Sequence, residues 1–127
     1  MLKDVLIDPY YPNCPIRNIL SRISDRWSML ILLTLDAAGG SMRYSEIAGK
    51  IPDISQKMLT VTLRSLEADG LVSRQVYAEV PPRVEYSVTD RAKTLVPHIN
   101  TLVDWAMQNL NAILTDRQAY AQKRKGK

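Results

Sequence analysis

Apolar residues recur every three or four positions in the first part of the chain, which is the spacing of one helix face. This pattern predicts a first helix that begins at Pro15, because proline lacks the backbone N–H that has no partner at a helix start. A second, strongly apolar helix is predicted over residues 25–38, with Asp25 as its N-cap and Gly39 at its end. The residues predicted to form its buried stripe are Trp27, Leu30, Ile31 and Leu35.

A short helix, a tight turn and a longer helix are predicted next. Residues 42–43 suit a very short strand, residues 44–50 a short helix and residues 51–54 a turn. Ser55 is a favourable N-cap for the longer helix, which is predicted to extend to Ala68. Two helices joined by a short turn form a helix-turn-helix.

The longer helix has two different faces. Leu59, Leu63 and Leu66 recur at helical spacing, so their face is predicted to lie in the core. The other side of the helix carries mainly polar and basic side chains, namely Gln56, Lys57, Thr60, Val61 and Arg64.

The pattern then changes from the period of a helix to that of strands. Residues 71–77 and 84–88 are predicted to pair as a hairpin, joined by a loop that contains two prolines. A last helix follows, capped by Thr89, and Pro97 is expected to kink or restart it. The fold class expected is mainly α with a small antiparallel β-hairpin. In this α+β arrangement the hairpin is the wing of a winged helix-turn-helix.

The formal net charge of +4 comes from the end of the chain. The last twelve residues hold five basic residues and one acidic residue, so the rest of the chain is neutral. Bulk charge therefore says little about a nucleic-acid partner. We expect residues 1–13 to form an N-terminal arm, residues 14–114 a single winged helix-turn-helix domain, and residues 115–127 a basic tail.

The composition argues against several classes of protein. The chain of 127 residues has no apolar run of the ~20 residues that span a bilayer. Its start lacks a signal-peptide core, so a cytoplasmic protein without a membrane partner is expected. One cysteine cannot form a disulfide within the chain, and one cysteine with one histidine does not suggest a metal site. Without a phosphate loop or a nucleophile elbow, we expect neither a cofactor nor an enzyme.

The polar face of the longer helix suits the major groove of DNA, which admits one α-helix. Gln56 suits an adenine edge, and Lys57 and Arg64 suit guanine or phosphate. Thr60 is expected to bond a phosphate or to pack on a thymine methyl group. Arg83, beside the prolines of the wing, is expected to lie along the backbone or in the minor groove. The residues expected to contact DNA are Arg43, Ser55, Gln56, Lys57, Thr60, Arg64 and Arg83.

Two other interpretations of the same pattern stay open. An amphipathic helix with two basic residues outside is also typical of a solvated face, and some winged helices bind other proteins instead of DNA. A thiol enzyme is disfavoured, because the single histidine, His98, lies far along the chain from the single cysteine.

A series of short stretches occurs in a distinctive order and spacing. They are Cys14-Pro15-Ile16, Arg26-Trp27, Arg43-Tyr44-Ser45-Glu46-Ile47, Ile54-Ser55-Gln56-Lys57-Met58-Leu59-Thr60, Leu63-Arg64-Ser65-Leu66-Glu67-Ala68-Asp69-Gly70-Leu71-Val72 and Val80-Pro81-Pro82-Arg83-Val84-Glu85-Tyr86, with Pro97 and Trp105. Over about three quarters of its length the chain thereby resembles HxlR-type regulators, a branch of winged-helix proteins related to the MarR group. It departs from them at Ser24-Asp25 and at Ala92, where glycines are frequent.

The resemblance implies a homodimeric transcriptional repressor or activator that binds an inverted-repeat operator. The longer helix would read the major groove, and the wing would flank it. The first and last helices would build the dimer interface. The residues expected in that interface are Ile16, Ile19, Leu20, Leu102, Trp105 and Leu110.

Cys14 directly precedes the predicted first helix. At an N-cap, the helix dipole and the nearby Arg17 would lower the pKa of its thiol. Several HxlR-type proteins use a cysteine at the matching position to sense quinones, aldehydes or oxidants, so the resemblance implies a small electrophile or oxidant as effector. The alternative is a small buried residue at a dimer seam.

Overall fold

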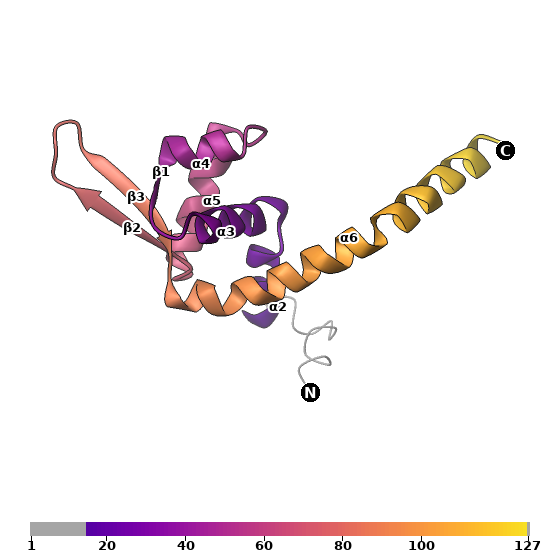
Figure 1. The fold of residues 1–127 in the computed structure, drawn as a ribbon, viewed down its shortest axis with the longest axis horizontal. Coiled ribbons are helices and arrows are strands. Elements are labelled where there is room, and N and C mark those ends of the chain that lie inside the picture. Colours follow the sequence, from indigo (N-terminus) through magenta and orange to yellow (C-terminus); the bar gives the residue numbers. More distant parts are fainter. Residues whose placement is uncertain (1–14, 127) are drawn as a thin grey trace. The chain divides into compact units, whose positions relative to one another are not determined.

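The computed structural model describes residues 15–126 (Figure 1). The chain divides into two compact units, Met1–Val96 and Pro97–Lys127. The described part of the first unit combines helices with a small sheet, and the second unit is helical. The elements of the first unit are, in chain order, α2 (Pro15–Ile23), α3 (Arg26–Ala38), β1 (Met42–Arg43), α4 (Tyr44–Lys50), α5 (Gln56–Ala68), β2 (Val72–Tyr77) and β3 (Arg83–Val88).

The boundaries of α3 follow from its two caps. Asp25 accepts hydrogen bonds from the backbone N–H groups of Trp27 at 2.9 Å and Ser28 at 2.8 Å, which confirms it as the N-cap. Gly39 follows the helix with φ 71°, a left-handed conformation that glycine adopts without a Cβ clash. The predicted stripe is wrong at Leu30, which is 40% exposed, and at Trp27, which is only half-buried. The buried positions of α3 are Ser28, Ile31, Leu32 and Leu35.

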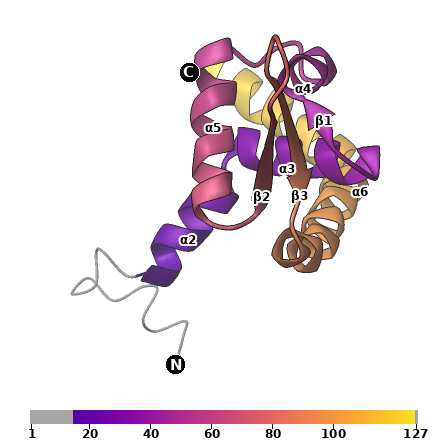
Figure 2. The same ribbon diagram turned by 90° about the vertical axis from the view of Figure 1, so that its left-hand side faces the viewer.

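The sheet joins the short strand to the wing. Its order is β1-β3-β2 and both pairs are antiparallel, with Met42 opposite Tyr86 and Val72 opposite Val88. The predicted hairpin and the predicted short strand are both confirmed. Figure 2 shows β2 and β3 as the two long strands of the wing, with α5 beside them. Because β1 leads directly into α4, its pairing fixes the start of α4 against the wing.

The core of the first unit lies between α3, α5 and the sheet. Leu59, Leu63 and Leu66 are at most 2% exposed, which confirms the predicted inner face of α5. Burying one such side chain stabilises the fold by about 1.5–3 kcal/mol. The other buried apolar residues on elements of this unit include Ile31, Leu32, Leu35, Met42, Ile47 and Val72.

The last helix, α6 (Asp90–Lys125), begins in the first unit and makes up the second. The Thr89 hydroxyl accepts the Ala92 N–H at 3.2 Å, which confirms the predicted cap. Pro97 lies inside α6 and the helix continues on both sides of it, so of the two predicted outcomes the restart is excluded and the kink stays a prediction. The helix also continues through residues 114–115, where we predict the basic tail to begin, and that division stays a prediction. Within residues 15–126, no helix combines the length and apolar character needed to cross a membrane.

Candidate nucleic-acid interface

The helix-turn-helix consists of α4, the turn over residues 51–55 and α5. A Glu46 carboxylate oxygen accepts the Arg43 N–H at 2.9 Å, and the Ser55 hydroxyl accepts the Met58 N–H at 3.1 Å. These two contacts satisfy N–H groups that have no partner within a helix at its start. Ile47 and Ile51 are buried, so the turn is held from inside. The polar side of α5 is left toward solvent.

Most of the predicted DNA-contacting residues share that side of α5. Gln56, Lys57 and Arg64 are exposed, and Thr60 is half-buried at the edge of the same face. Among the described residues, no acidic oxygen lies within ion-pair distance of Lys57 or Arg64. Both positive charges are therefore available to an external anion.

Tyr44, the first residue of α4, connects the two helices of the motif. Its hydroxyl donates to the Gln56 carbonyl at 2.9 Å and lies 2.9 Å from the Thr60 hydroxyl. Sequence reasoning missed this role, because hydrophobic periodicity cannot show a hydrogen bond between residues sixteen positions apart. The contact fixes the spacing of α4 and α5.

Arg83 is not the free cation that the sequence predicts at the wing tip. It is the first residue of β3, and its side chain is only 29% exposed. Its Nε lies 2.9 Å from Glu85 Oε2, an ion pair without hydrogen-bond geometry, and its Nη2 lies 3.5 Å from Glu79 Oε1. Its guanidinium also stacks 4.0 Å from the centre of the Tyr77 ring. The predicted strand starts one residue late, at residue 84; with Arg83 included in β3, Arg83 and Glu85 are two apart on a strand and share a face.

A polar hollow of about 330 Å³ lies between α5 and the wing strands. Arg64 of α5 and Arg74 of β2 both line this hollow, and Arg74 is exposed. Sequence reasoning did not single out Arg74, although a basic residue in a predicted wing strand was a visible signal. The residues that line the hollow are Thr60, Leu63, Arg64, Glu67, Arg74 and Tyr86.

Arg43 belongs to a second hollow, of about 480 Å³, between the start of α4 and the wing loop. It is exposed and precedes Tyr44, while residues 79–84 form the opposite wall. The structure thus places Arg43 beside the wing and Ser55 at the start of α5. Six of the seven predicted residues lie on the helix-turn-helix or at its start, and Arg83 lies in the wing.

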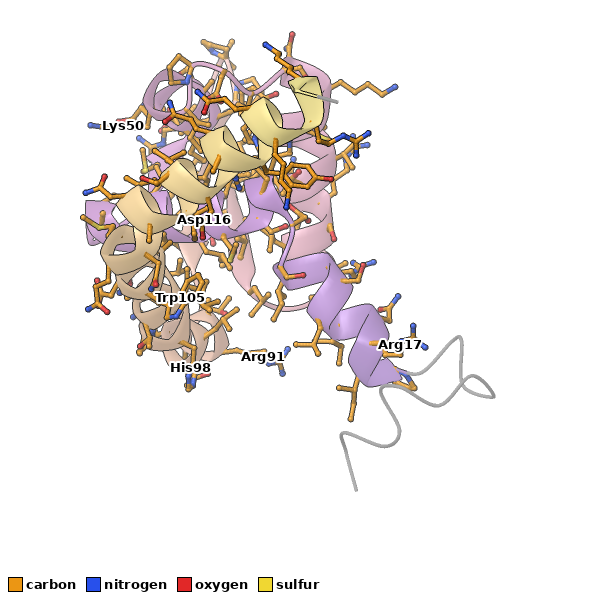
Figure 3. The ribbon with its side chains drawn as sticks, turned by 90° about the vertical axis from the view of Figure 1, so that its right-hand side faces the viewer. Arg17, Lys50, Arg91, His98, Trp105 and Asp116 are labelled. Atoms are coloured by element: carbon orange, nitrogen blue, oxygen red, sulfur yellow. The ribbon has the colours of Figure 1, made fainter. Side chains whose placement is uncertain are left out.

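The residues predicted for a dimer interface lie on α2 and on α6. On α2, Ile19 is 54% exposed, and Leu20 is exposed as well. On α6, Leu102, Trp105 and Leu110 are each more than half exposed, and Figure 3 shows Trp105 projecting from that helix. Exposed large apolar side chains that recur along one helix indicate a surface that another molecule covers. Ile16 is half-buried.

Cys14, the predicted redox-sensing residue, lies outside the described residues. Arg17, which the sequence places near it, is exposed on α2. No cluster of three or more possible metal ligands occurs within residues 15–126.

Comparisons with a family model and with individual proteins point to the same family. A family model described as HxlR-like helix-turn-helix matches residues 22–114. An HTH-type transcriptional regulator of Methanothermobacter thermautotrophicus is 46% identical over 92 residues, which are 72% of this chain and 69% of that protein.

Solved structures match most of the chain as well. The transcriptional regulator YtfH of Salmonella typhimurium has a TM-score of 0.76 at 36% identity, over 87% of this chain and 97% of that one. The redox regulator HypR in its reduced form has a TM-score of 0.71 at 37% identity, over 80% of this chain and 98% of that one. At 36% and 37% identity, both proteins resemble this chain in sequence as well as in fold.

Proposed function

The chain belongs to the HxlR-like helix-turn-helix family of transcriptional regulators, and from this premise we propose that it binds a specific double-stranded operator as a homodimer. The observation that carries the proposal is the exposed face of α5. There Lys57 and Arg64 have no acidic partner among the described residues, while Leu59 and Leu63 fasten the opposite face to the core. A chromosomal operator would place the working protein in the cytoplasm.

In this proposal α5 enters the major groove, which is wide enough for one helix. Gln56 and Arg64 reach base edges, and Lys57 meets a base or a phosphate. Arg43 and Arg74 flank the helix on two sides and meet the backbone. Arg83 contributes less than the sequence suggests, because Glu79 and Glu85 already neutralise it.

The apolar side chains exposed on α2 and on α6 support a homodimer. Contact with a second subunit would remove these side chains from water, which is favourable. Two symmetric reading helices would require an inverted repeat. Its half-sites would lie about 34–36 Å apart, or a multiple of that distance, on one face of the DNA.

The test starts from duplexes selected from a randomised library by the purified full chain. We expect the selected duplexes to contain an inverted repeat. The logarithm of the binding constant should fall linearly with the logarithm of the salt concentration. Lys57→Ala should reduce the steepness of that log–log slope by about 1, the amount expected for the loss of one phosphate contact. Lys93→Ala is the matched control, because it removes the same charge from an exposed site on α6.

The alternative, a winged helix that binds another protein, predicts no salt-dependent binding to any duplex. Recovery of no enriched sequence by the folded wild type would therefore contradict the proposed function.

We further propose that Cys14 makes operator binding sensitive to oxidants or electrophiles. Support comes from the similarity to HypR, which is described as a redox regulator. With one cysteine per chain, a disulfide must join two subunits or one subunit and a small thiol. Two Cys14 thiols lose two hydrogens to diamide, which becomes the hydrazine.

Cys14→Ser tests this role. Diamide should change the operator affinity of the wild type and leave the affinity of the variant unchanged, as measured by fluorescence anisotropy. Mass spectrometry without reductant identifies the product. An equal response of both proteins to diamide would rule out Cys14 as the sensor.

A further inference from the structure

A threonine inside a helix can donate its hydroxyl hydrogen to the carbonyl four residues earlier. Thr62 of α5 does so and donates to the Met58 carbonyl at 2.7 Å. Thr34 of α3 does the same toward the Leu30 carbonyl, also at 2.7 Å.

Thr60 is arranged differently. The carbonyl four residues before it belongs to Gln56, and the Tyr44 hydroxyl donates to that carbonyl at 2.9 Å. A carbonyl only accepts, and a tyrosine hydroxyl has one hydrogen. The Tyr44 hydrogen is therefore used on Gln56. In the 2.9 Å contact between the two hydroxyl groups, Thr60 is then the donor and Tyr44 the acceptor.

From this geometry we infer that Thr60, whose hydroxyl hydrogen is held by Tyr44, acts as a hydrogen-bond acceptor toward DNA. The hydrogen of Thr60 points at Tyr44, so only the lone pairs of Thr60 Oγ1 and its methyl group remain for a ligand. Tyr44 is a positioning residue in this arrangement, and Thr60 is the residue that makes contact. The inference rests on the proposed function, since it says which chemical groups α5 recognises.

The consequence is a preference among DNA groups. Phosphate oxygens, guanine N7 and O6, and thymine O4 all accept hydrogen bonds and cannot pair with an acceptor. The adenine N6 and cytosine N4 amino groups donate in the major groove and can pair with it. Thr60 is therefore expected to read an amino group, and the phosphate contact that the sequence suggests for it is disfavoured.

The decisive probes are duplexes of the selected operator in which single groups are removed. Purine in place of adenine lacks the N6 amino group, and 7-deazaguanine lacks the N7 acceptor. For the wild type, loss of one amino group should weaken binding by about two- to tenfold, the usual worth of one neutral hydrogen bond. Thr60→Val should bind the intact operator that much more weakly and show no further loss on the same substitution.

Tyr44→Phe frees the Gln56 carbonyl, to which Thr60 can then donate as Thr62 does to the Met58 carbonyl, so this variant should keep the preference for the amino group. Thr60→Ser keeps the hydroxyl and should retain the preference. Tyr120→Phe is the matched control, since it removes a hydroxyl from the exposed far end of α6 and should change nothing. Circular dichroism verifies folding. If Tyr44→Phe does not fold, the Thr60 variants on the modified duplexes still decide the question.

Two results would overturn the inference while leaving DNA binding intact. One is a loss of Thr60-dependent affinity on removal of a base acceptor. The other is a folded Thr60→Val variant that loses as much affinity as the wild type when the amino group is removed. Failure of the wild type to bind any duplex would instead reject the proposed function itself.

Discussion

Asp25 shows how much one residue can specify locally. A single carboxylate accepts two backbone N–H groups and, at 2.8 Å, the hydroxyl of Ser28, and so fixes the start of α3. Such a cap is recognisable from the sequence, because donor and acceptor lie within three residues. The burial of Ser28 and the exposure of Leu30 were not recognisable, since they depend on which side of α3 meets α5 and the sheet.

Asp25→Ala should lower the free energy of unfolding by about 0.5–2 kcal/mol, the usual cost of losing an N-cap. Urea denaturation measures the change. Asp36→Ala, in the last turn of the same helix, should cost less. Equal losses for the two variants would mean that the cap adds nothing beyond a general charge effect.

Arg64 and Arg83 are expected to differ in their contribution to operator affinity. Arg64→Ala removes a cation with no acidic partner among the described residues, so affinity should fall by about 1–3 kcal/mol. Arg83→Ala removes a cation already paired with Glu79 and Glu85, so its effect should be smaller. Fluorescence anisotropy on the selected operator ranks the two. The reverse ranking would show that Arg83 leaves its carboxylates when DNA binds.

At the scale of elements, the helices and the hairpin were predictable and the third strand pairing was not. Ser55 and three spaced leucines are enough to locate α5 within a residue or so. The pairing of β1 with β3 joins residues more than forty positions apart, and no local pattern encodes it. The Tyr44 contact was missed for the same reason. Candidate residues on one helix face could thus be predicted, whereas their partners on other elements could not.

Gly39 and Gly70 follow α3 and α5 with φ of 71° and 72°. Replacing either with alanine puts a Cβ in the left-handed region, which costs about 1–2 kcal/mol. Gly70→Ala should cost slightly more, because the Arg91 guanidinium, the far end of a flexible side chain, must then move and give up its 2.9 Å hydrogen bond to the Asp69 carbonyl. Gly39 has open space around it. Thermal unfolding of both variants gives the order, and a larger loss at Gly39 would contradict it.

At the scale of the molecule, the exposed apolar side chains of α6 bear on the predicted homodimer. Leu110→Asp places a charge among them and should shift the protein toward monomer in analytical ultracentrifugation. Operator affinity should fall with it, because each monomer then holds only one half-site. Gln108→Asp introduces the same charge at an exposed polar position and should leave the mass unchanged. A wild-type protein that sediments as a monomer would remove the basis for an inverted repeat.

The exposed face of α5 takes little part in holding the fold together. Surface substitutions away from caps and cores usually change stability by no more than about 0.5 kcal/mol. Gln56, Lys57 and Arg64 can therefore be exchanged at little cost in folding free energy, while the inner leucines stay constant. Substituting a few exposed side chains of α5 could therefore direct the protein to a different promoter while the fold stays the same.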